Sequence, residues 1–591
     1  MKMESGRSSL PRQRHAGVCL HITSLPGPYG IGEIGAAAHH FIDRMVNMEL
    51  SVWQFLPLGP TAYGDSPYQP LSTFAGNEML IDIGNLIDLG LLDEDEVEEL
   101  TTLSDRYVDY GALIPIKNRL LYLAASRFES MANLALLDDF RRFLKRNDAE
   151  WLHDYALFRI LKTKHGERPW PEWKPEFVHR DAYALARVEK REATRLRALK
   201  IIQYLFFRQW SELRDYAHER GITLFGDMPI YIALDSSDAW ANREMLRLDE
   251  DGRPDAVAGV PPDYFAEDGQ LWGNPLYDWD KHAADGYSWW VDRLRATAEL
   301  TDLVRIDHFR GFEAYWAIPA DAETARTGVW EPGPCDAIFD AMRDALGKLP
   351  IVAENLGVIT PEVEDLRERH GMPGMYVLQF DVCDPEFSLD DVDENSVCYT
   401  GTHDNDTTIG WFYGSPGDIR SKEEIQHAQR SVLSMTGGSA ETVHTDLIKA
   451  AFSTRAHLAI APMQDYLGLG SVARTNTPGT PGGNWRWRLI DTQLSVEFCD
   501  NVASLVITSD RGLTCHGVSN KKYPPPRKSS HPRYARPGPG RRQGIEASRT
   551  HGLARQTGHV LRWQVPHHRF SALQLHQLGH SAHRRADPVQ G

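Results

Sequence analysis

The chain has 591 residues, of which 42% are hydrophobic and 25% charged, and its formal net charge is −18. This composition is that of a globular protein and excludes a fibre, a coiled-coil rod or a chain that is disordered throughout. The acidic balance also argues against nucleic acid as the main partner, because phosphate binding requires a basic surface.

Residues 1–16 form an N-terminal arm with four basic residues but no apolar segment, so they do not resemble a secretory signal. No apolar run along the chain approaches the ~18 residues of a membrane span. The six cysteines are scattered without a CxxC pair, which indicates neither a zinc ribbon nor a disulfide framework. We therefore expect a cytoplasmic protein with reduced cysteines and no membrane partner.

Short apolar runs bounded by Gly, Pro, Asp or Asn recur along the chain and are typical of parallel strands buried on both faces. The runs are 17–22, 51–56, 222–225, 303–306, 351–353, 375–380, 396–399 and 457–461. Amphipathic segments lie between several of them, at 34–48, 287–299 and 336–346. Eight strands with intervening helices predict a (β/α)₈ TIM barrel over residues 17–515.

The interval from about 80 to 220, between the second and third predicted strands, is too long for a single crossover. Four segments in it have helical periodicity, at 114–131, 136–144, 151–164 and 189–217. The sequence therefore predicts a large helical insertion in the barrel.

The C-terminal tail, 516–591, has a different composition. From residue 521 onward it contains three lysines and eleven arginines against two acidic residues, eight histidines, and a Pro/Gly-rich run at 523–540. Such a segment buries little apolar surface, and we expect it to be disordered. It is a solvated basic tail, the product of a shifted reading frame, or a nucleic-acid-binding arm; the first two are favoured, because no base-reading motif accompanies the charge.

Acidic residues follow four of the predicted strands, namely Asp227, Asp307, Glu354 and Asp404. Barrel enzymes carry their chemistry at the carboxyl ends of the strands, so these groups are expected to converge on one mouth. Convergent carboxylates without a metal cluster or a phosphate loop suit the cleavage of a glycosidic bond, whose transition state is positively charged.

The two carboxyl groups in such a reaction need different environments. Arg305 lies two residues before Asp307, on the same face of the strand, and a neighbouring cation favours the ionised carboxylate that a nucleophile requires. Glu354 follows three apolar residues, and an apolar setting favours the protonated form that a general acid requires.

Three motifs carry a family resemblance: VRIDHFRGF at 304–312, AENLG at 353–357 and GTHDNDT at 401–407. They resemble the 4-α-glucanotransferases, also called amylomaltases or disproportionating enzymes, of glycoside hydrolase family 77. Further similar segments extend the likeness from about residue 17 to about residue 489. The resemblance implies retaining transfer of an α-1,4-glucan segment to the 4-hydroxyl of glucose or another glucan, with maltodextrins as substrates and no cofactor or metal.

Carried over residue by residue, the resemblance makes Asp307 the nucleophile and Glu354 the general acid and then base. It makes Asp404 a group that grips sugar hydroxyls and stabilises the distorted transition state. Arg305 would orient Asp307, while His403 and Asp227 would bind sugar hydroxyls.

Loop aromatics provide flat faces on which sugar rings can stack, and the candidates are Tyr63, Tyr68, Tyr264 and Trp272; alternatively they pack the loops onto the barrel.

Two departures from the family stand out. Asn355 follows Glu354 where the family often has Asp, and nothing after about residue 515 resembles the family. The cluster at 404–406 lacks the Gly and distal Glu of a calcium loop, so no metal is expected.

Two other functions remain open. An α-glucan hydrolase would share the covalent intermediate and differ only in using water to resolve it. A non-catalytic glucan-binding pseudoenzyme would result if the altered C-terminus disabled catalysis.

Overall fold

The computed structural model describes residues 10, 13–262, 267–415, 418–480 and 482–513. All of these belong to one compact unit, Met1–Lys522. The predicted basic tail and Tyr264 lie outside the described residues, and so does most of the N-terminal arm.

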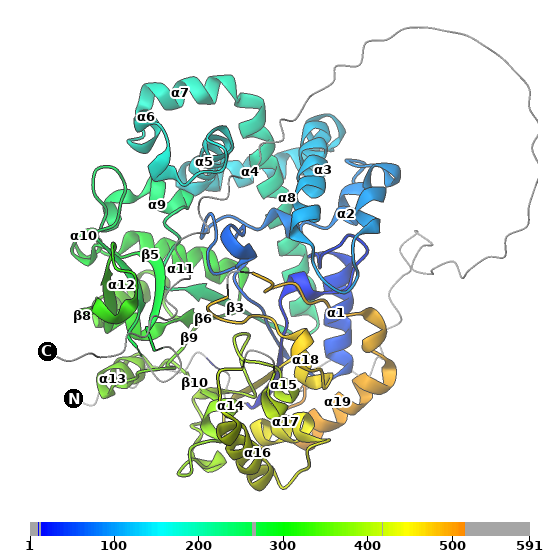
Figure 1. The fold of residues 1–591 in the computed structure, drawn as a ribbon. Coiled ribbons are helices and arrows are strands. Elements are labelled where there is room, and N and C mark those ends of the chain that lie inside the picture. Colours follow the sequence, from blue (N-terminus) through cyan, green and yellow to red (C-terminus); the bar gives the residue numbers. More distant parts are fainter. Residues whose placement is uncertain (1–9, 11–12, 263–266, 416–417, 481, 514–591) are drawn as a thin grey trace, which may run out of the picture. The chain divides into compact units, whose positions relative to one another are not determined.

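The unit is built on a ring of eight parallel strands, as the sequence predicted (Figure 1). Seven neighbouring pairs form a continuous ladder, and the ring closes where the Ala353 amide donates to the Pro373 carbonyl at 2.8 Å. The strands are β1 (His15–Cys19), β2 (Val52–Gln54), β3 (Thr223–Pro229), β6 (Leu303–Asp307), β9 (Ile351–Ala353), β10 (Gly374–Val377), β11 (Ser396–Tyr399) and β12 (Leu458–Pro462).

Side chains from every strand fill the interior of this ring, which makes it a packed core rather than a pore. The cluster contains one or two residues per strand, all of them buried: Cys19, Val52, Phe225, Leu303, Val352, Met375, Val377, Val397, Tyr399, Leu458 and Ile460. Both faces of each strand are therefore covered, which explains why the strands appear in the sequence as short continuous apolar runs.

Helices cover the outside of the ring, and their apolar stripes face it. They are α1 (Ala36–Asn47), α11 (Ser288–Leu300), α12 (Asp336–Leu346), α13 (Pro361–Arg369), α14 (Leu378–Asp381), α15 (Thr408–Tyr413), α16 (Lys422–Thr436), α17 (Val443–Ser453), α18 (Met463–Tyr466) and α19 (Val496–Thr508). The predicted segment 336–346 coincides with α12, whereas α15, α16 and α17 between β11 and β12 were not predicted.

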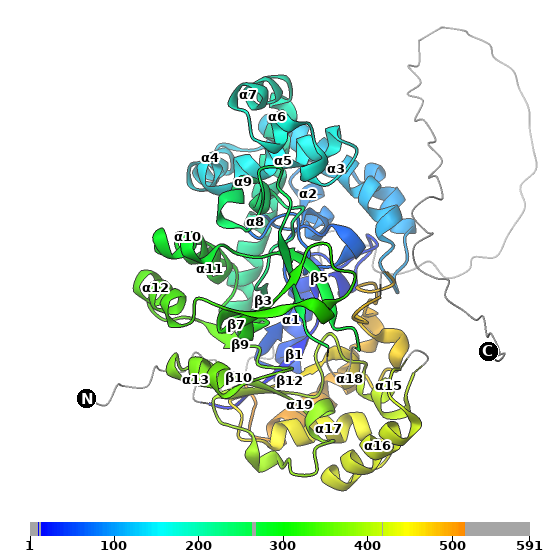
Figure 2. The same ribbon diagram turned by 60° about the vertical axis from the view of Figure 1, so that its left-hand side comes forward.

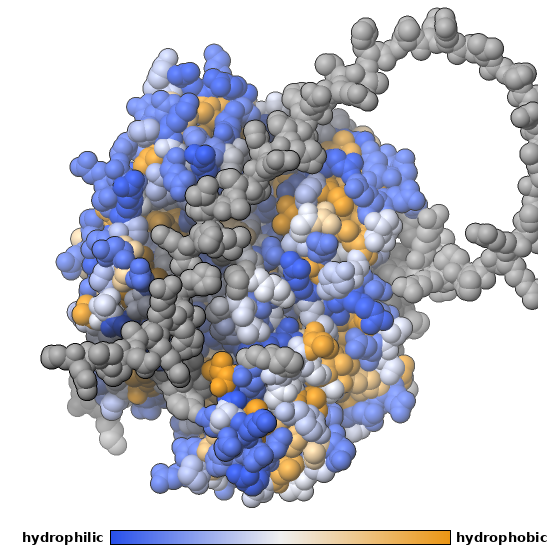
Figure 3. All heavy atoms as spheres, in the orientation of Figure 1, coloured by the Kyte–Doolittle hydropathy of each residue, from blue (hydrophilic) through white to orange (hydrophobic). Residues whose placement is uncertain are grey.

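The predicted helical insertion is confirmed between β2 and β3. Its helices are α2 (Ile83–Asp88), α3 (Tyr110–Met131), α4 (Leu134–Asn147), α5 (His153–Lys164), α6 (Pro175–Val178), α7 (Ala182–Arg191) and α8 (Ala193–Glu219). The predicted single helix 189–217 is wrong at its start, because α7 ends at Arg191 and α8 begins at Ala193. The surface over α6 and α7 is predominantly hydrophilic (Figure 3).

A second, antiparallel sheet follows β3 and was missed from the sequence (Figure 2). Its four strands, in the order β5-β4-β7-β8, are β5 (Gln270–Pro275), β4 (Ala256–Val260), β7 (Ala314–Pro319) and β8 (Val329–Pro332). The short helix α9 (Ser237–Ala241) precedes the sheet in sequence, and the short helix α10 (Trp279–Ala284) follows β5. Across the described ranges, none of the helices has both the length and the apolar character that crossing a membrane requires.

Candidate active site

Strand register brings the predicted acidic residues together. In the ladder between β3 and β6, Asp227 lies opposite Arg305. In the ladder between β6 and β9, Ile306 lies opposite Ala353, one step before Asp307 and Glu354. Adjacent parallel strands end at the same edge, so the two carboxyl groups reach the same mouth of the barrel.

Arg305 links two of these carboxylates. Its Nη1 donates to Asp227 Oδ2 at 2.7 Å, and its Nη2 donates to Asp307 Oδ1 at 2.8 Å. The Asp227 side chain is 0% exposed, whereas that of Asp307 is 31% exposed. Burial raises the pKa of Asp227, and Arg305 opposes this effect. The guanidinium therefore orients Asp307 from behind while the Asp307 carboxylate stays accessible.

Glu354 is held by backbone amides. Its Oε2 accepts from the His308 amide at 2.6 Å, and its Oε1 accepts from the Leu356 amide at 3.0 Å. His308 has a φ of +55°, a left-handed conformation that a non-glycine residue rarely adopts and that marks the turn directly after Asp307. Burial raises the pKa of Glu354 to about 7, with Arg305 opposing the rise and Asp307 adding to it.

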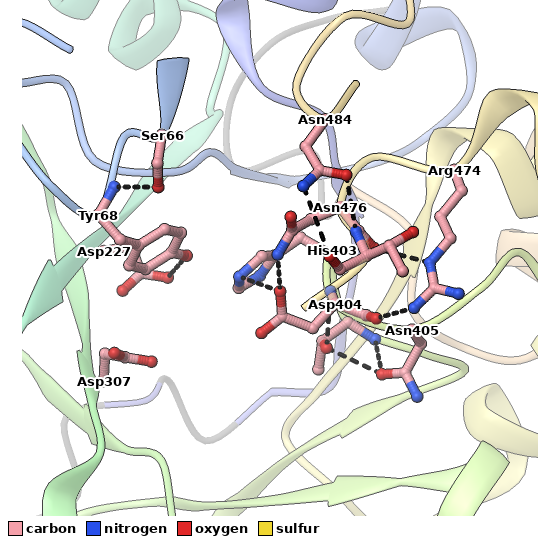
Figure 4. Close-up of polar contacts among 12 residues, drawn as sticks. Ser66, Tyr68, Asp227, Asp307, His403, Asp404, Asn405, Arg474, Asn476 and Asn484 are labelled. Carbon is pink, nitrogen blue, oxygen red and sulfur yellow. Dashed lines mark hydrogen bonds and ion pairs between the residues drawn. The ribbon is translucent and has the colours of Figure 1, made fainter. Parts of the chain in front are cut away.

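Asp404 and His403 lie on the loop that follows β11. The Asp404 side chain is 45% exposed, and its Oδ1 accepts from Asn476 Nδ2 at 2.6 Å and lies 3.3 Å from His403 Nε2. Arg474 Nη2 donates to the Asp404 carbonyl at 2.7 Å. Figure 4 shows Asp307 on one side of an open space and Asp404 on the other.

A cleft of about 990 Å³ contains the site. Seven of the candidate residues line it, namely Tyr68, Trp272, Arg305, Asp307, Glu354, His403 and Asp404. The Trp272 ring meets the His308 ring edge-on at 4.8 Å between centroids, and it is half-buried. The volume and the mixture of polar groups with an aromatic wall suit an organic ligand of several rings.

Of the predicted binding residues that the structure describes, Asp227 does not contribute to this lining. The Asp227 side chain is buried beneath Arg305 and does not reach the cleft. Tyr264 and the side chain of Tyr63 lie outside the described part of the chain.

Tyr68 lines the cleft, but its contacts differ from those of a free stacking platform. Its hydroxyl donates to Asp227 Oδ2 at 3.0 Å, and its ring stacks on His403 at 5.0 Å and 11° (Figure 4). Tyr68 therefore connects the buried carboxylate below Arg305 with the loop that carries Asp404.

Two residues of the site escaped the sequence analysis. Asn476 and Arg474 hold Asp404 from a segment 70 to 72 residues downstream. The only signal for them was their position within the part of the chain that resembles the family, which ends at about residue 489, because long-range pairing cannot be read from spacing.

Comparison with models of protein families assigns the chain to a family. The model of the family described as 4-alpha-glucanotransferase matches residues 20–493. The chain belongs to this 4-alpha-glucanotransferase family. The match covers seven of the eight barrel strands, beginning just after β1, and it includes Asp307, Glu354 and Asp404.

Individual 4-alpha-glucanotransferases agree with this assignment. The Synechocystis protein is 44% identical over 490 residues, which cover 82% of this chain and 95% of the relative. The Thermus thermophilus protein is 44% identical over 510 residues, which cover 84% of this chain and 99% of the relative. The chain therefore spans nearly the whole length of these relatives.

A solved structure supports the same family. The amylomaltase from Streptococcus agalactiae in complex with acarbose superimposes with a TM-score of 0.79 at 36% identity, covering 85% of this chain and 100% of that chain. The amylomaltase from Corynebacterium glutamicum, at 18% identity and a TM-score of 0.68, shows the shared fold.

No set of three or more His, Cys, Asp or Glu side chains that could hold a metal ion occurs within the described ranges.

Proposed function

We propose that this chain is a 4-α-glucanotransferase that moves a segment of an α-1,4-glucan onto the 4-hydroxyl of glucose or another glucan, with retention of configuration. The observation that carries the proposal is the pairing of Asp307 with Glu354 at neighbouring strand ends. Asp307 is held by Arg305 and open to the cleft, whereas Glu354 is buried with a raised pKa. Retaining glycoside cleavage requires this division between a nucleophile and an acid.

In the first step, Asp307 attacks the anomeric carbon of the donor while Glu354 donates its proton to the glycosidic oxygen. The bond between the anomeric carbon and that oxygen breaks, and an ester between the glucan segment and Asp307 forms. The departing sugar leaves with the proton from Glu354, which is then a carboxylate.

In the second step, Glu354 acts as the base. It takes the proton from the acceptor's 4-hydroxyl, the acceptor oxygen attacks the anomeric carbon, and the ester to Asp307 breaks. Two inversions give net retention, and both carboxyl groups return to their starting forms.

The remaining residues bind and orient the sugar. Asp404 and His403 face Asp307 across the cleft and would bind hydroxyls of the distorted ring. Trp272 would stack on a sugar, while Asp227 would act through Arg305, because its own side chain is buried. A cytoplasmic location remains a prediction of the sequence.

Incubation of the purified protein with maltotriose tests the proposal. Transfer produces glucose and a ladder of longer maltodextrins at a constant number of reducing ends. Reducing ends that accumulate without longer products would indicate an α-glucan hydrolase, and binding of maltodextrin without any product would indicate a pseudoenzyme. Either outcome would refute the transfer reaction.

A further inference from the structure

Asp465 is a buried carboxylate outside the cleft, and it lies just after β12 in the short helix α18. Its residue is 1% exposed. Its hydrogen-bond donors are Thr400 and Thr408, whose side chains are also fully buried. Burying a carboxylate there costs solvation free energy, which its hydrogen bonds must offset.

The two threonines flank the loop that carries His403 and Asp404. Thr400 Oγ1 donates to Asp465 Oδ2 at 2.7 Å, from the end of β11. Thr408 donates to the same carboxylate twice, from its amide to Oδ1 at 2.7 Å and from its hydroxyl to Oδ2 at 2.8 Å. One side chain therefore fixes both ends of the loop at 401–407.

The residue before Asp465 fixes the second segment that holds Asp404. Gln464 Nε2 donates to the Ala473 carbonyl at 3.0 Å and to Thr475 Oγ1 at 2.9 Å. The next residue in that segment is Asn476, which donates to Asp404 Oδ1. The consecutive side chains of Gln464 and Asp465 thus anchor the loop that carries Asp404 and the segment whose Asn476 binds it.

We propose that Asp465 is a positioning residue that sets the placement of Asp404 and His403 by clamping the two ends of their loop, with Gln464 anchoring the neighbouring support. The inference rests on the proposed function of Asp404. Asp465 would affect catalysis through geometry, since displacement of a reacting group by about 1 Å can cost on the order of 100-fold in rate.

The test compares Asp465→Asn with wild type in maltotriose disproportionation. Asparagine keeps the shape but offers one acceptor oxygen where the carboxylate offers two. We expect kcat to fall about 10- to 100-fold, the size of a misplaced transition-state contact, with KM changed less than about threefold. Thr408→Val should also lower kcat, whereas Thr408→Ser, which keeps the hydroxyl, should retain most of the activity.

Asp82→Asn is the matched control. Asp82 is also a buried aspartate that joins two segments, and it accepts from the Asn85 amide at 2.6 Å and the Ala36 amide at 3.2 Å. It caps α2 at the start of the insertion and is not among the residues that line the cleft, so we expect the kcat of Asp82→Asn to stay within about twofold of wild type. A comparable loss of kcat in this control would assign the effect to general stability and overturn the positioning role.

A double-mutant cycle with His403→Ala separates positioning from partial unfolding. If Asp465 acts through this loop, Asp465→Asn should cost less than about threefold in the His403→Ala background, because interacting residues are non-additive. Hydrogen exchange at 401–408 should also rise in Asp465→Asn, and this readout needs no activity. Undiminished kcat with unchanged exchange would overturn the inference, whereas a wild-type protein that makes no ladder would instead refute the proposed function.

Discussion

Replacement of Glu354 by glutamine tests the electrostatic basis of the proposed acid. Glu354 is 8% exposed, and burial raises its pKa from 4.5 to about 7. A raised pKa means that the folded protein binds the proton more tightly than the unfolded chain. The stability from protonated Glu354 is complete below about pH 4.5 and is lost as the pH rises through about 7. A glutamine side chain does not titrate, so the Glu354→Gln variant should lack this loss.

The size of the effect follows from the two pKa values. At 1.36 kcal/mol per pKa unit, wild type should lose about 2–3 kcal/mol relative to Glu354→Gln between pH 5 and pH 8. With an unfolding entropy of about 2.1 cal/mol/K per residue over roughly 500 folded residues, this corresponds to about 2–3 °C in Tm. Glutamine also cannot accept from both the His308 and Leu356 amides. That penalty, about 1–3 kcal/mol, is the same at every pH.

The assay is therefore the Tm difference between Glu354→Gln and wild type, measured from pH 5 to pH 8. We expect the difference to shift by about 2–3 °C in favour of the variant as the pH rises. The shift should persist in about 0.5 M NaCl, because salt screens buried groups poorly. A difference that stays constant across this range would refute the raised pKa. The variant should also lose transfer from maltotriose but still react with maltosyl fluoride, whose leaving group needs no acid.

Three further substitutions test individual contacts. Asp307→Asn should lower transfer from maltotriose by at least about 1000-fold with Tm within a few degrees of wild type, since the nucleophile is lost; full activity would refute its role. Tyr68→Phe should keep the ring on His403 but lose the bond to Asp227, costing about 1 kcal/mol in unfolding experiments; an unchanged unfolding free energy would contradict that bond. Trp272→Ala should raise KM for maltotriose more than Trp272→Phe does; equal KM values would exclude stacking.

The fold was predictable where the hydrophobic pattern of a segment matches its burial in the folded protein. All eight barrel strands lie within a few residues of their predicted places, because burial on both faces leaves an apolar run in the sequence. The antiparallel sheet was missed although β4 and β7 are mostly buried; its edge strands β5 and β8 are partly exposed and leave no such run. The break between α7 and α8 was missed because periodicity continues across it.

The candidate site was predictable only for residues whose position depends on the barrel strand that carries or precedes them. Asp307 ends β6, Glu354 directly follows β9 and Asp404 lies on the loop after β11, so barrel geometry brings them to one mouth. The burial of Asp227 was not predictable, because it depends on Arg305 from the next strand and Tyr68 from a distant loop. The amide of His308 that holds Glu354 depends on a left-handed backbone turn, which the pattern of residues around it does not reveal.

Asn355, the departure from the family, lies at the junction that closes the barrel. Its Oδ1 accepts from the Met375 amide at 2.7 Å, and its Nδ2 donates to Glu364 Oε1 at 2.7 Å. Aspartate could accept the first bond but would face Glu364 as a like charge. Asparagine instead donates a hydrogen bond to the Glu364 carboxylate. Asn355→Asp should lower Tm, because the introduced carboxylate would face the Glu364 carboxylate as a like charge. Adding Glu364→Gln should restore most of the loss, since a glutamine amide can donate to the introduced aspartate. If the double variant is no more stable than the single one, the asparagine is not explained by Glu364.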